Sequence, residues 1–201
     1  MVYHIRKSAK RITSMFDEEW KRAEIVHIDK INWVNYPYVP YTTGRIMHSD
    51  YGIHILMQTD EKPLLARFTD QNSSVCRDSC MELFISPNDG DKRYINFEFN
   101  PFGTMYLAVR TSRFDYEHPK ENREYFEVQS LVDEEKWTLQ LTIPFEFIDK
   151  IFGGHTRSMR ANMYKCTEEG NCEHYVSLFP VNTPKPDFHR PEFFGDFILC
   201  D

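Results

Sequence analysis

Strict alternation of apolar and polar residues is the dominant pattern along this chain. The segment Trp137–Ile143 alternates without a break, with its apolar residues on one face and threonine and glutamine on the other. Tyr94–Asn100 does the same, and Asn96, Glu98 and Asn100 form its polar face. Since side chains alternate across a strand, both segments are predicted to be strands with one face against a core.

Turn-forming residues separate further short segments of strand character. These predicted strands are Arg45–His48, Ile53–Thr59, Leu64–Phe68, Cys80–Ile85, Thr104–Arg110, Phe126–Val132, Met159–Lys165 and Asp196–Leu199. Only two short helices are expected, around Phe16–Ala23 and from Pro144 to Ile151. Many strands with few helices favour an all-β fold, a β-sandwich, and residues 1–201 are enough for one such domain. Trp20 and Trp137 are expected in its core.

A second candidate polar face follows Asp78. In the predicted strand after Asp78, Glu82 and Phe84 share one face, and three apolar residues share the other. If this strand pairs with Tyr94–Asn100, Glu82 and Glu98 lie on the same face. Such a face is either solvated or lines a concavity, and acids and amides repeated without lysine favour the concavity.

The C-terminal segment Asp187–Gly195 combines polar side chains that can form hydrogen bonds with aromatic rings. It contains Phe188, His189, Arg190 and Glu192 beside a proline. A sugar offers apolar C–H faces to rings and hydroxyls to polar groups, so this composition suits a carbohydrate ligand. The alternative is a loop whose rings fill the end of a core.

Asn32–Thr43 is an irregular segment rich in aromatic residues, among them Trp33. It either lines a binding site or lies over one edge of the core.

Charge and hydropathy exclude several function classes. The net charge is −7, which argues against a phosphate-backbone partner and so against nucleic acid. No basic amphipathic stretch or long apolar run suggests a membrane. The N-terminus lacks the apolar region of a signal peptide, so the chain as written is expected to be cytoplasmic, or extracellular if trimmed from a precursor.

Five cysteines leave at least one unpaired. Buried inert thiols are the first expectation, and a Cys166–Cys172 disulfide is an alternative. A zinc site is a third reading, built from Cys76, Cys80, Cys166 and Cys172 with His174. No cofactor is expected. Calcium at the acidic stretch 88–91 remains open, although a hairpin turn explains those residues equally well.

Catalytic signatures are sparse. The sequence has no nucleophile elbow and no glycine-rich phosphate loop. Glu82 and Glu98 on neighbouring strands would stand roughly 5 Å apart, close to the spacing of a retaining glycosidase pair. Any cross-strand pair of acids satisfies that spacing, so a glycosidase remains an alternative only.

Taken in order, these motifs resemble a family 9 carbohydrate-binding module, in particular its stand-alone branch. The resemblance rests on Asp78–Glu82, Asn96–Asn100, Trp137–Pro144, Arg160–Cys166 and Phe188–Gly195. It implies a β-sandwich of immunoglobulin-like or jelly-roll character, related to DOMON-type haem and sugar binders. It also implies non-catalytic binding of a glucan, xylan or oligosaccharide, in support of polysaccharide breakdown.

The family clamps a sugar between two tryptophans. By position, Phe188 corresponds to one of the two stacking residues of the family, and Glu82 corresponds to an acid of its site. Glu98 occupies the position at which the family has an arginine. The other tryptophan falls near Val75 or Cys76, which do not stack. The resemblance therefore implies that Trp33 or a tyrosine of the segment 36–41 takes its place. The runner-up from the related fold is a non-covalent haem domain that uses Met163 and a histidine.

Overall fold

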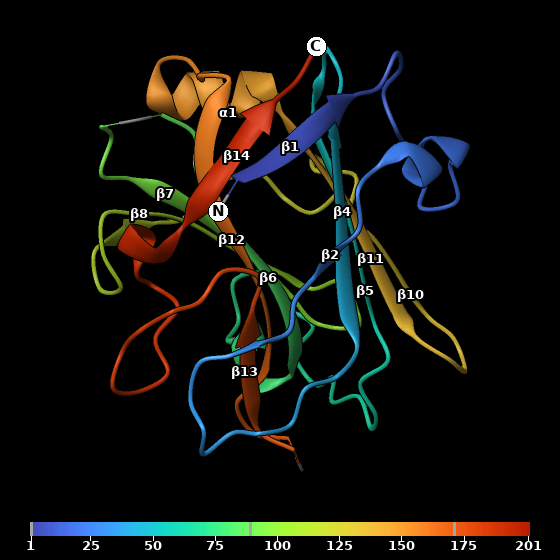
Figure 1. Ribbon diagram of the computed structural model, residues 1–201, viewed down its shortest axis with the longest axis vertical. Helices are drawn as coiled ribbons and strands as arrows, with labels where there is room; N and C mark the ends of the chain where they lie inside the picture. Colours follow the sequence, from blue (N-terminus) through green and yellow to red (C-terminus); the bar gives the residue numbers. More distant parts are fainter. Residues whose placement is uncertain (1, 89, 171) are drawn as a thin grey trace.

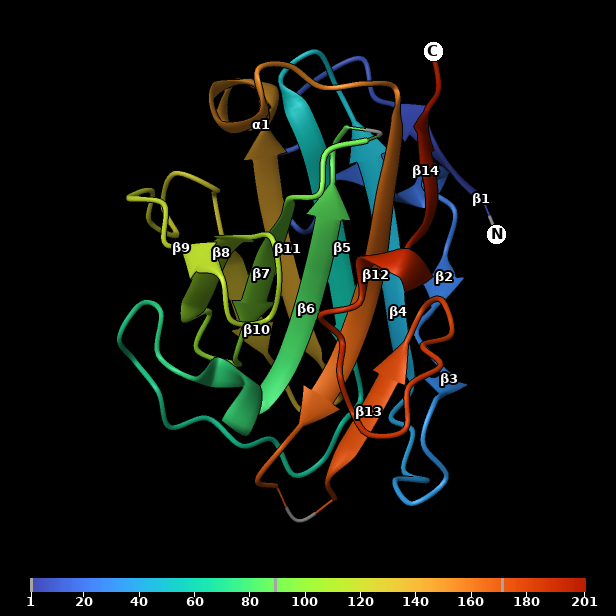
Figure 2. The same ribbon diagram turned by 90° about the vertical axis from the view of Figure 1, so that its left-hand side faces the viewer.

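The computed structural model describes residues 2–88, 90–170 and 172–201, and they form two sheets packed face to face. The first sheet has the order β1 (Val2–Lys7), β14 (Gly195–Leu199), β12 (Ser158–Thr167), β6 (Ser79–Ser86), β7 (Tyr94–Phe99), β8 (Met105–Arg110) and β9 (Tyr116–Glu117). The strands β13 (His174–Ser177) and β3 (Lys30–Ile31) extend it beside β12. Figure 2 shows β6, β7 and β12 in front of the second sheet.

The second sheet has the order β10 (Gln129–Val132), β11 (Trp137–Pro144), β5 (Gly52–Thr59) and β4 (Thr42–His48), with β2 (Val26–His27) along β4. The strand β1 joins the two sheets, because it pairs in parallel with β14 through residues 2–5 and with β4 through residues 6–7. Figure 1 shows β1 and β14 side by side. The expected β-sandwich is therefore confirmed.

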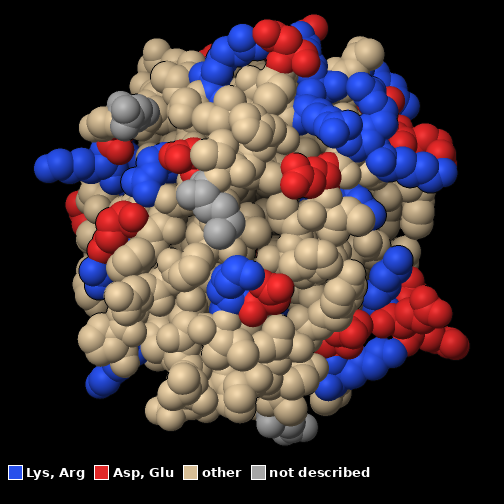
Figure 3. Space-filling model, in the orientation of Figure 1, with Lys and Arg blue, Asp and Glu red and all other residues tan. Residues whose placement is uncertain are grey.

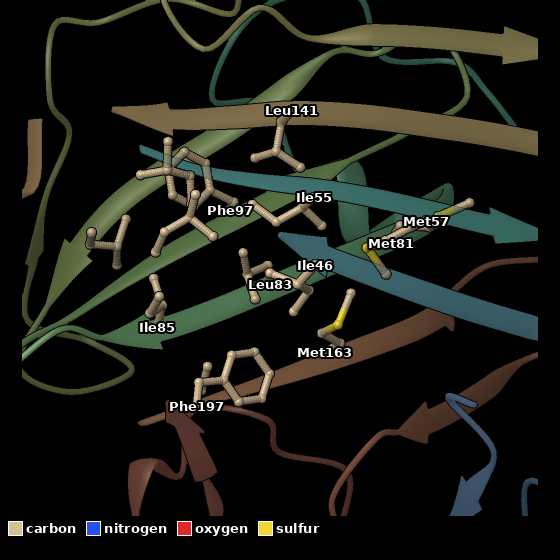
Figure 4. Close-up of a cluster of buried hydrophobic side chains, with 14 of the residues drawn as sticks. Ile46, Ile55, Met57, Met81, Leu83, Ile85, Phe97, Leu141, Met163 and Phe197 are labelled. Atoms are coloured by element: carbon tan, nitrogen blue, oxygen red, sulfur yellow. The ribbon is translucent and has the colours of Figure 1, made fainter. Parts of the chain in front are cut away.

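The main core lies between the sheets. Inward residues of one sheet, such as Leu83 and Phe97, meet inward residues of the other, such as Ile55 and Leu141 (Figure 4). Trp137 is fully buried in this core. The helix α1 (Phe145–Phe152) follows β11 directly and buries Phe147, Ile148 and Phe152. It matches the helix predicted after Pro144.

The other predicted helix is shorter than expected. The chain forms a single 3₁₀ turn, η1 (Glu18–Arg22), whose first turn is capped by the side chain of Asp17. Trp20 is 4% exposed and packs in a small satellite cluster with Ile12, Met47 and Leu56. Both tryptophans are thus buried, as expected.

One predicted strand is absent from the described residues. Leu64–Phe68 is irregular, and its backbone donors are satisfied by side chains instead of by a neighbouring strand. The carboxylate of Asp78 accepts from the N–H groups of Arg67 and Phe68, and the hydroxyl of Ser79 accepts from that of Leu65. Side-chain acceptors of this kind compete with strand pairing. The two other short 3₁₀ turns are η2 (Val75–Arg77) and η3 (Pro191–Phe193).

The surface shows no broad field of one sign on the side seen in Figure 3. Lysine and arginine side chains lie among acidic ones, mainly away from a wide uncharged centre. Within the described ranges, no helix has the length and apolar character needed to cross a membrane.

Candidate functional site

The outer face of the first sheet is covered by irregular chain rather than exposed to solvent. Some side chains of β6, β7 and β12 point away from the main core. They form a second apolar cluster with side chains of the irregular segments that cover this face of the sheet. The cluster contains Trp33, Val75, Cys80, Phe84, Tyr94, Tyr164, Cys166, Val181, Phe188 and Phe194. The polar face predicted from the alternation is therefore enclosed.

A cavity of about 490 Å³ opens within this covered layer. Its sheet side carries Glu82, Glu98 and Cys166, and its walls include the rings of Tyr36, Tyr175 and Phe188. Charged side chains stand around it, namely Arg77, Arg113, Glu168, Glu169, Lys185 and Asp187. Its volume falls in the range of about 300–1,000 Å³ that is usual for small-ligand sites.

Glu82 and Glu98 are direct partners across β6 and β7, as the alternation predicted. They are 3% and 6% exposed. Burial raises the pKa of Glu98 to about 7, and burial together with the neighbouring Glu98 carboxyl raises the pKa of Glu82 well above its usual value. Two carboxyl groups this close resist simultaneous ionisation, so they titrate as a pair.

A chain of hydrogen bonds orients Glu98. The amide of Asn96 donates to Oε1 of Glu98 at 3.0 Å, and Oδ1 of Asn96 accepts from Nε of Arg110 at 2.8 Å. Arg110 is itself 5% exposed and donates to the hydroxyl of Tyr106 at 2.7 Å. Asn96 therefore links the Glu98 carboxyl group to Arg110 and holds that carboxyl group in position.

Aromatic rings form one wall of the cavity. The ring of Phe188 stacks on that of Tyr164, with centroids 4.0 Å apart, and is 8% exposed. The rings of Tyr36 and Tyr175 meet edge to face at 4.9 Å, and both are only partly buried. These two tyrosines present the more accessible rings.

The start of the C-terminal loop is tied to the sheet and to a neighbouring loop. Nδ1 of His189 lies 3.0 Å from the hydroxyl of Tyr94, and its ring stacks on Phe84 with centroids 5.0 Å apart. Burial lowers the pKa of His189 to about 3, so its imidazole is neutral. Asp187 forms a 3.0 Å ion pair with Arg113, from the loop after β8.

The structure places the other predicted site residues away from this cavity. Arg190 and Glu192 form an exposed ion pair with each other, and Glu192 borders a separate surface depression. The indole of Trp33 lies behind Phe188, at 5.8 Å, and donates to the carbonyl of Thr183. Asn100 holds the turn after β7, since its Oδ1 accepts from the N–H groups of Phe102 and Thr104.

Several lining residues carried no clear signal in the sequence. Tyr36 belongs to the aromatic segment Asn32–Thr43, which was noted as a candidate wall. Tyr175 lies on β13, a strand that the alternation did not reveal, and reaches the cavity because it pairs with Cys166 on β12. The β12–β13 hairpin thus places Tyr175 beside the sheet residues of the cavity.

All five cysteines are free, so Cys166 and Cys172 form no disulfide. Cys80 and Cys166 are direct partners across β6 and β12. Cys172 is exposed, and His174 points instead to Lys165, whose Nζ lies 3.2 Å from its Nε2. The five zinc ligands predicted from the spacing therefore do not meet at one place: Cys80 and Cys166 lie together, and Cys172 and His174 lie apart from them.

The acidic stretch 88–91 is only partly described, because residue 89 lies outside the described residues. The carboxylate of Asp91 accepts from Nε of Arg93 and forms an ion pair with its guanidinium at 2.7 Å. The amide of Asn88 donates to the carbonyl of Gly154. Asp91 and Asn88 are thus engaged within the protein.

A larger hollow of about 590 Å³ lies along β8 and β9. Its lining includes the ion pair of Lys150 with Glu121 at 2.8 Å, and Tyr116 and His118. It holds none of the residues singled out from the sequence, and we base the site on the smaller cavity with its buried carboxyl pair.

Comparison with known proteins agrees with this fold. The model of carbohydrate-binding family 9 matches residues 12–199. A solved structure from Bacteroides uniformis, provisionally described as a carbohydrate-binding protein, is 25% identical, with a TM-score of 0.88 and 98% of each chain covered. No curated protein sequence matches the chain.

Two structures of a family 9 module from Caldicellulosiruptor kristjanssonii share the fold. The complex with glucose has 12% identity and a TM-score of 0.70, and covers 100% of this chain and 96% of that one. The complex with cellotriose has 13% identity and a TM-score of 0.66, and covers 99% and 93%. The family model spans nearly the whole chain, and the protein therefore belongs to carbohydrate-binding family 9.

Proposed function

We propose that the protein binds a carbohydrate non-catalytically in the cavity between Glu82, Glu98 and the aromatic wall. The observation that carries this proposal is the pairing of two buried carboxyl groups with the rings of Tyr36, Tyr175 and Phe188 around one hollow of about 490 Å³. Carboxyl groups accept or donate hydrogen bonds to hydroxyls, and ring faces pack on C–H groups.

The ligand class that we propose is a short glucan or xylan oligosaccharide. Family membership supports it, and so do the glucose and cellotriose held by modules of the same fold. Val75 and Cys76 offer no stacking ring, so Tyr36 and Tyr175 would supply the second face in place of a tryptophan. Trp33 would act by buttressing Phe188.

The alternatives receive no support from these observations. Met163, the proposed haem ligand, is fully buried in the core between the sheets, with Sδ 3.1 Å from the place where a Cβ of Gly44 would lie. A retaining glycosidase needs an ionised nucleophile, whereas burial raises the pKa of both Glu82 and Glu98.

Calorimetric titration with glucose, cellotriose and xylotriose tests the proposal. Tyr175→Ala should weaken binding of whichever sugar the parent binds by about tenfold, the effect of losing one good ring contact. Glu192→Gln, outside the cavity, should bind like the parent. Binding that is unchanged in Tyr175→Ala and weakened in Glu192→Gln would move the site to the other face of the C-terminal loop.

A further inference from the structure

Two thiols and a carboxyl group converge on the sheet side of the cavity. Cys80 and Cys166 are directly opposite each other on β6 and β12, and Glu82 follows two residues after Cys80 on the same face. The two sulfur atoms and a carboxylate oxygen all lie within 4.8 Å of one another. The thiol of Cys166 donates to Oε1 of Glu82 at 3.0 Å.

The carboxyl group of Glu82 has no ion-pair partner in the part of the chain that the structure describes, although Glu82 is only 3% exposed. Its carboxyl group faces a second buried carboxyl, that of Glu98. An ionised carboxylate at such a place is costly unless a positive charge is supplied.

We propose that Cys80, Cys166 and Glu82 bind a zinc ion or a divalent cation of similar softness. Thiolate sulfur and carboxylate oxygen are established zinc ligands, and two sulfurs favour zinc over calcium or magnesium. At usual bond lengths, ligand atoms on one tetrahedral zinc ion lie roughly 3.3–3.8 Å apart. The three atoms need only small side-chain movements to reach that spacing.

The fourth coordination position faces the cavity. Glu82 and Cys166 both line that hollow, and so does the thiol-bearing Cys76 from η2. Three protein ligands with one open position is the arrangement of zinc sites that accept water or a ligand atom. Binding of the ion releases to solvent the protons of the two thiols and any proton on the Glu82 carboxyl group, because the thiolates and the carboxylate are the forms that coordinate.

This site differs from the set suggested by spacing in the sequence. It keeps Cys80 and Cys166, omits Cys76, Cys172 and His174, and adds Glu82, so its three ligands lie on the two neighbouring strands β6 and β12. It does not rest on sugar binding, because metal uptake is measured directly and without any sugar present.

Cobalt(II) is a suitable probe, because thiolate ligands give it intense charge-transfer absorption in the near ultraviolet. The reduced protein should take up one equivalent of cobalt(II) with that absorption, and zinc(II) should displace it. Cys166→Ser and Glu82→Gln should each lower zinc(II) affinity by at least roughly 100-fold, since even outer partners of a zinc ligand are worth about 10–100-fold.

Cys172→Ser is the matched control, because that cysteine is exposed and stands apart from the cluster. It should retain stoichiometric uptake with the parent spectrum. Thermal melting without metal identifies any variant that fails to fold, and Glu82→Gln provides a second test if Cys166→Ser does. The proposal is overturned if the reduced parent shows no thiolate–cobalt absorption, or if Cys172→Ser abolishes it while Cys166→Ser does not.

Discussion

At the scale of single residues, the carboxyl pair is the most informative feature of the molecule. Alternation predicted that Glu82 and Glu98 share a face, and their cross-strand pairing confirms it. The absence of lysine from this face favoured a concavity, but the way it is enclosed was not predictable, because the C-terminal loop and the segment around Trp33 cover it from distant parts of the chain.

The buried Glu98 makes stability depend on pH. Its pKa rises from 4.5 to about 7, mainly through burial, so between these values the folded protein keeps a proton that the unfolded chain releases. The free energy of unfolding should therefore fall as pH rises through this window, by on the order of 3 kcal/mol, and the raised pKa of the neighbouring Glu82 extends the fall to higher pH. Glu98→Gln should flatten that dependence.

Urea denaturation between pH 4.5 and pH 8 measures the effect. Glu18→Gln, at an exposed position, should keep the slope of the parent. A Glu98→Gln protein with the unaltered parental slope would show that Glu98 titrates normally.

Phe188 carries a prediction of its own. Phe188 is flanked by polar residues in the sequence, yet its ring is 8% exposed and stacks on Tyr164, with centroids 4.0 Å apart. Phe188→Ala should therefore lower the free energy of unfolding by about 3–5 kcal/mol, the usual cost of removing a buried ring. Chemical denaturation checks this, with Phe114→Ala, at a position 87% exposed, as the near-neutral control. A decrease in the free energy of unfolding of less than about 1 kcal/mol would mean that Phe188 contributes to ligand binding and not to the stability of the core.

At the scale of elements, strands with long uninterrupted alternation were predictable and short or irregular ones were not. Trp137–Ile143 and Tyr94–Asn100 match β11 and β7 almost residue for residue. The strands β1 and β13 were missed: β1 pairs only with segments far away in the sequence, and β13 is a short strand without clear alternation that pairs with β12 across a hairpin. The strand predicted at Leu64–Phe68 was wrong, because the side chains of Asp78 and Ser79 accept the backbone hydrogen bonds that a neighbouring strand would otherwise accept.

The strand β11 supplies the prediction at this scale. Trp137 is fully buried, and its indole donates to the hydroxyl of Ser130 at 2.9 Å. Trp137→Ala should lower the free energy of unfolding by about 3–5 kcal/mol through the cavity it leaves. Val132→Ala is the matched control, because Val132 is its cross-strand partner on β10 but is 48% exposed. Equal losses in the two variants would mean that pairing, and not burial, dominates at this site.

At the scale of the whole molecule, the sandwich determines which surfaces are available for binding. One face of each strand is used by the core between the sheets, and the outer face of β6, β7 and β12 is left to be built into a site by irregular chain. The family resemblance predicted this architecture, and it named Phe188 and Glu82, which the fold brings to one cavity. Tyr36 lies in the segment 36–41 that the resemblance had offered in place of the missing tryptophan, whereas the position of Tyr175 on β13 was not predicted.

The parallel pairing of β1 with β14 has a consequence for how the chain reaches its native state. β14 inserts between β1 and β12, so residues 2–5 find their partners only at residues 196–199. During synthesis, β1 leaves the ribosome well before its partner β14. Until Leu199 has left the exit tunnel, the edges of β1 and β12 that pair with β14 have no partner, and such edges are templates for wrong pairing. The first sheet is thus completed only after translation has passed the last strand, and the nascent chain depends on rapid closure or on a chaperone until then.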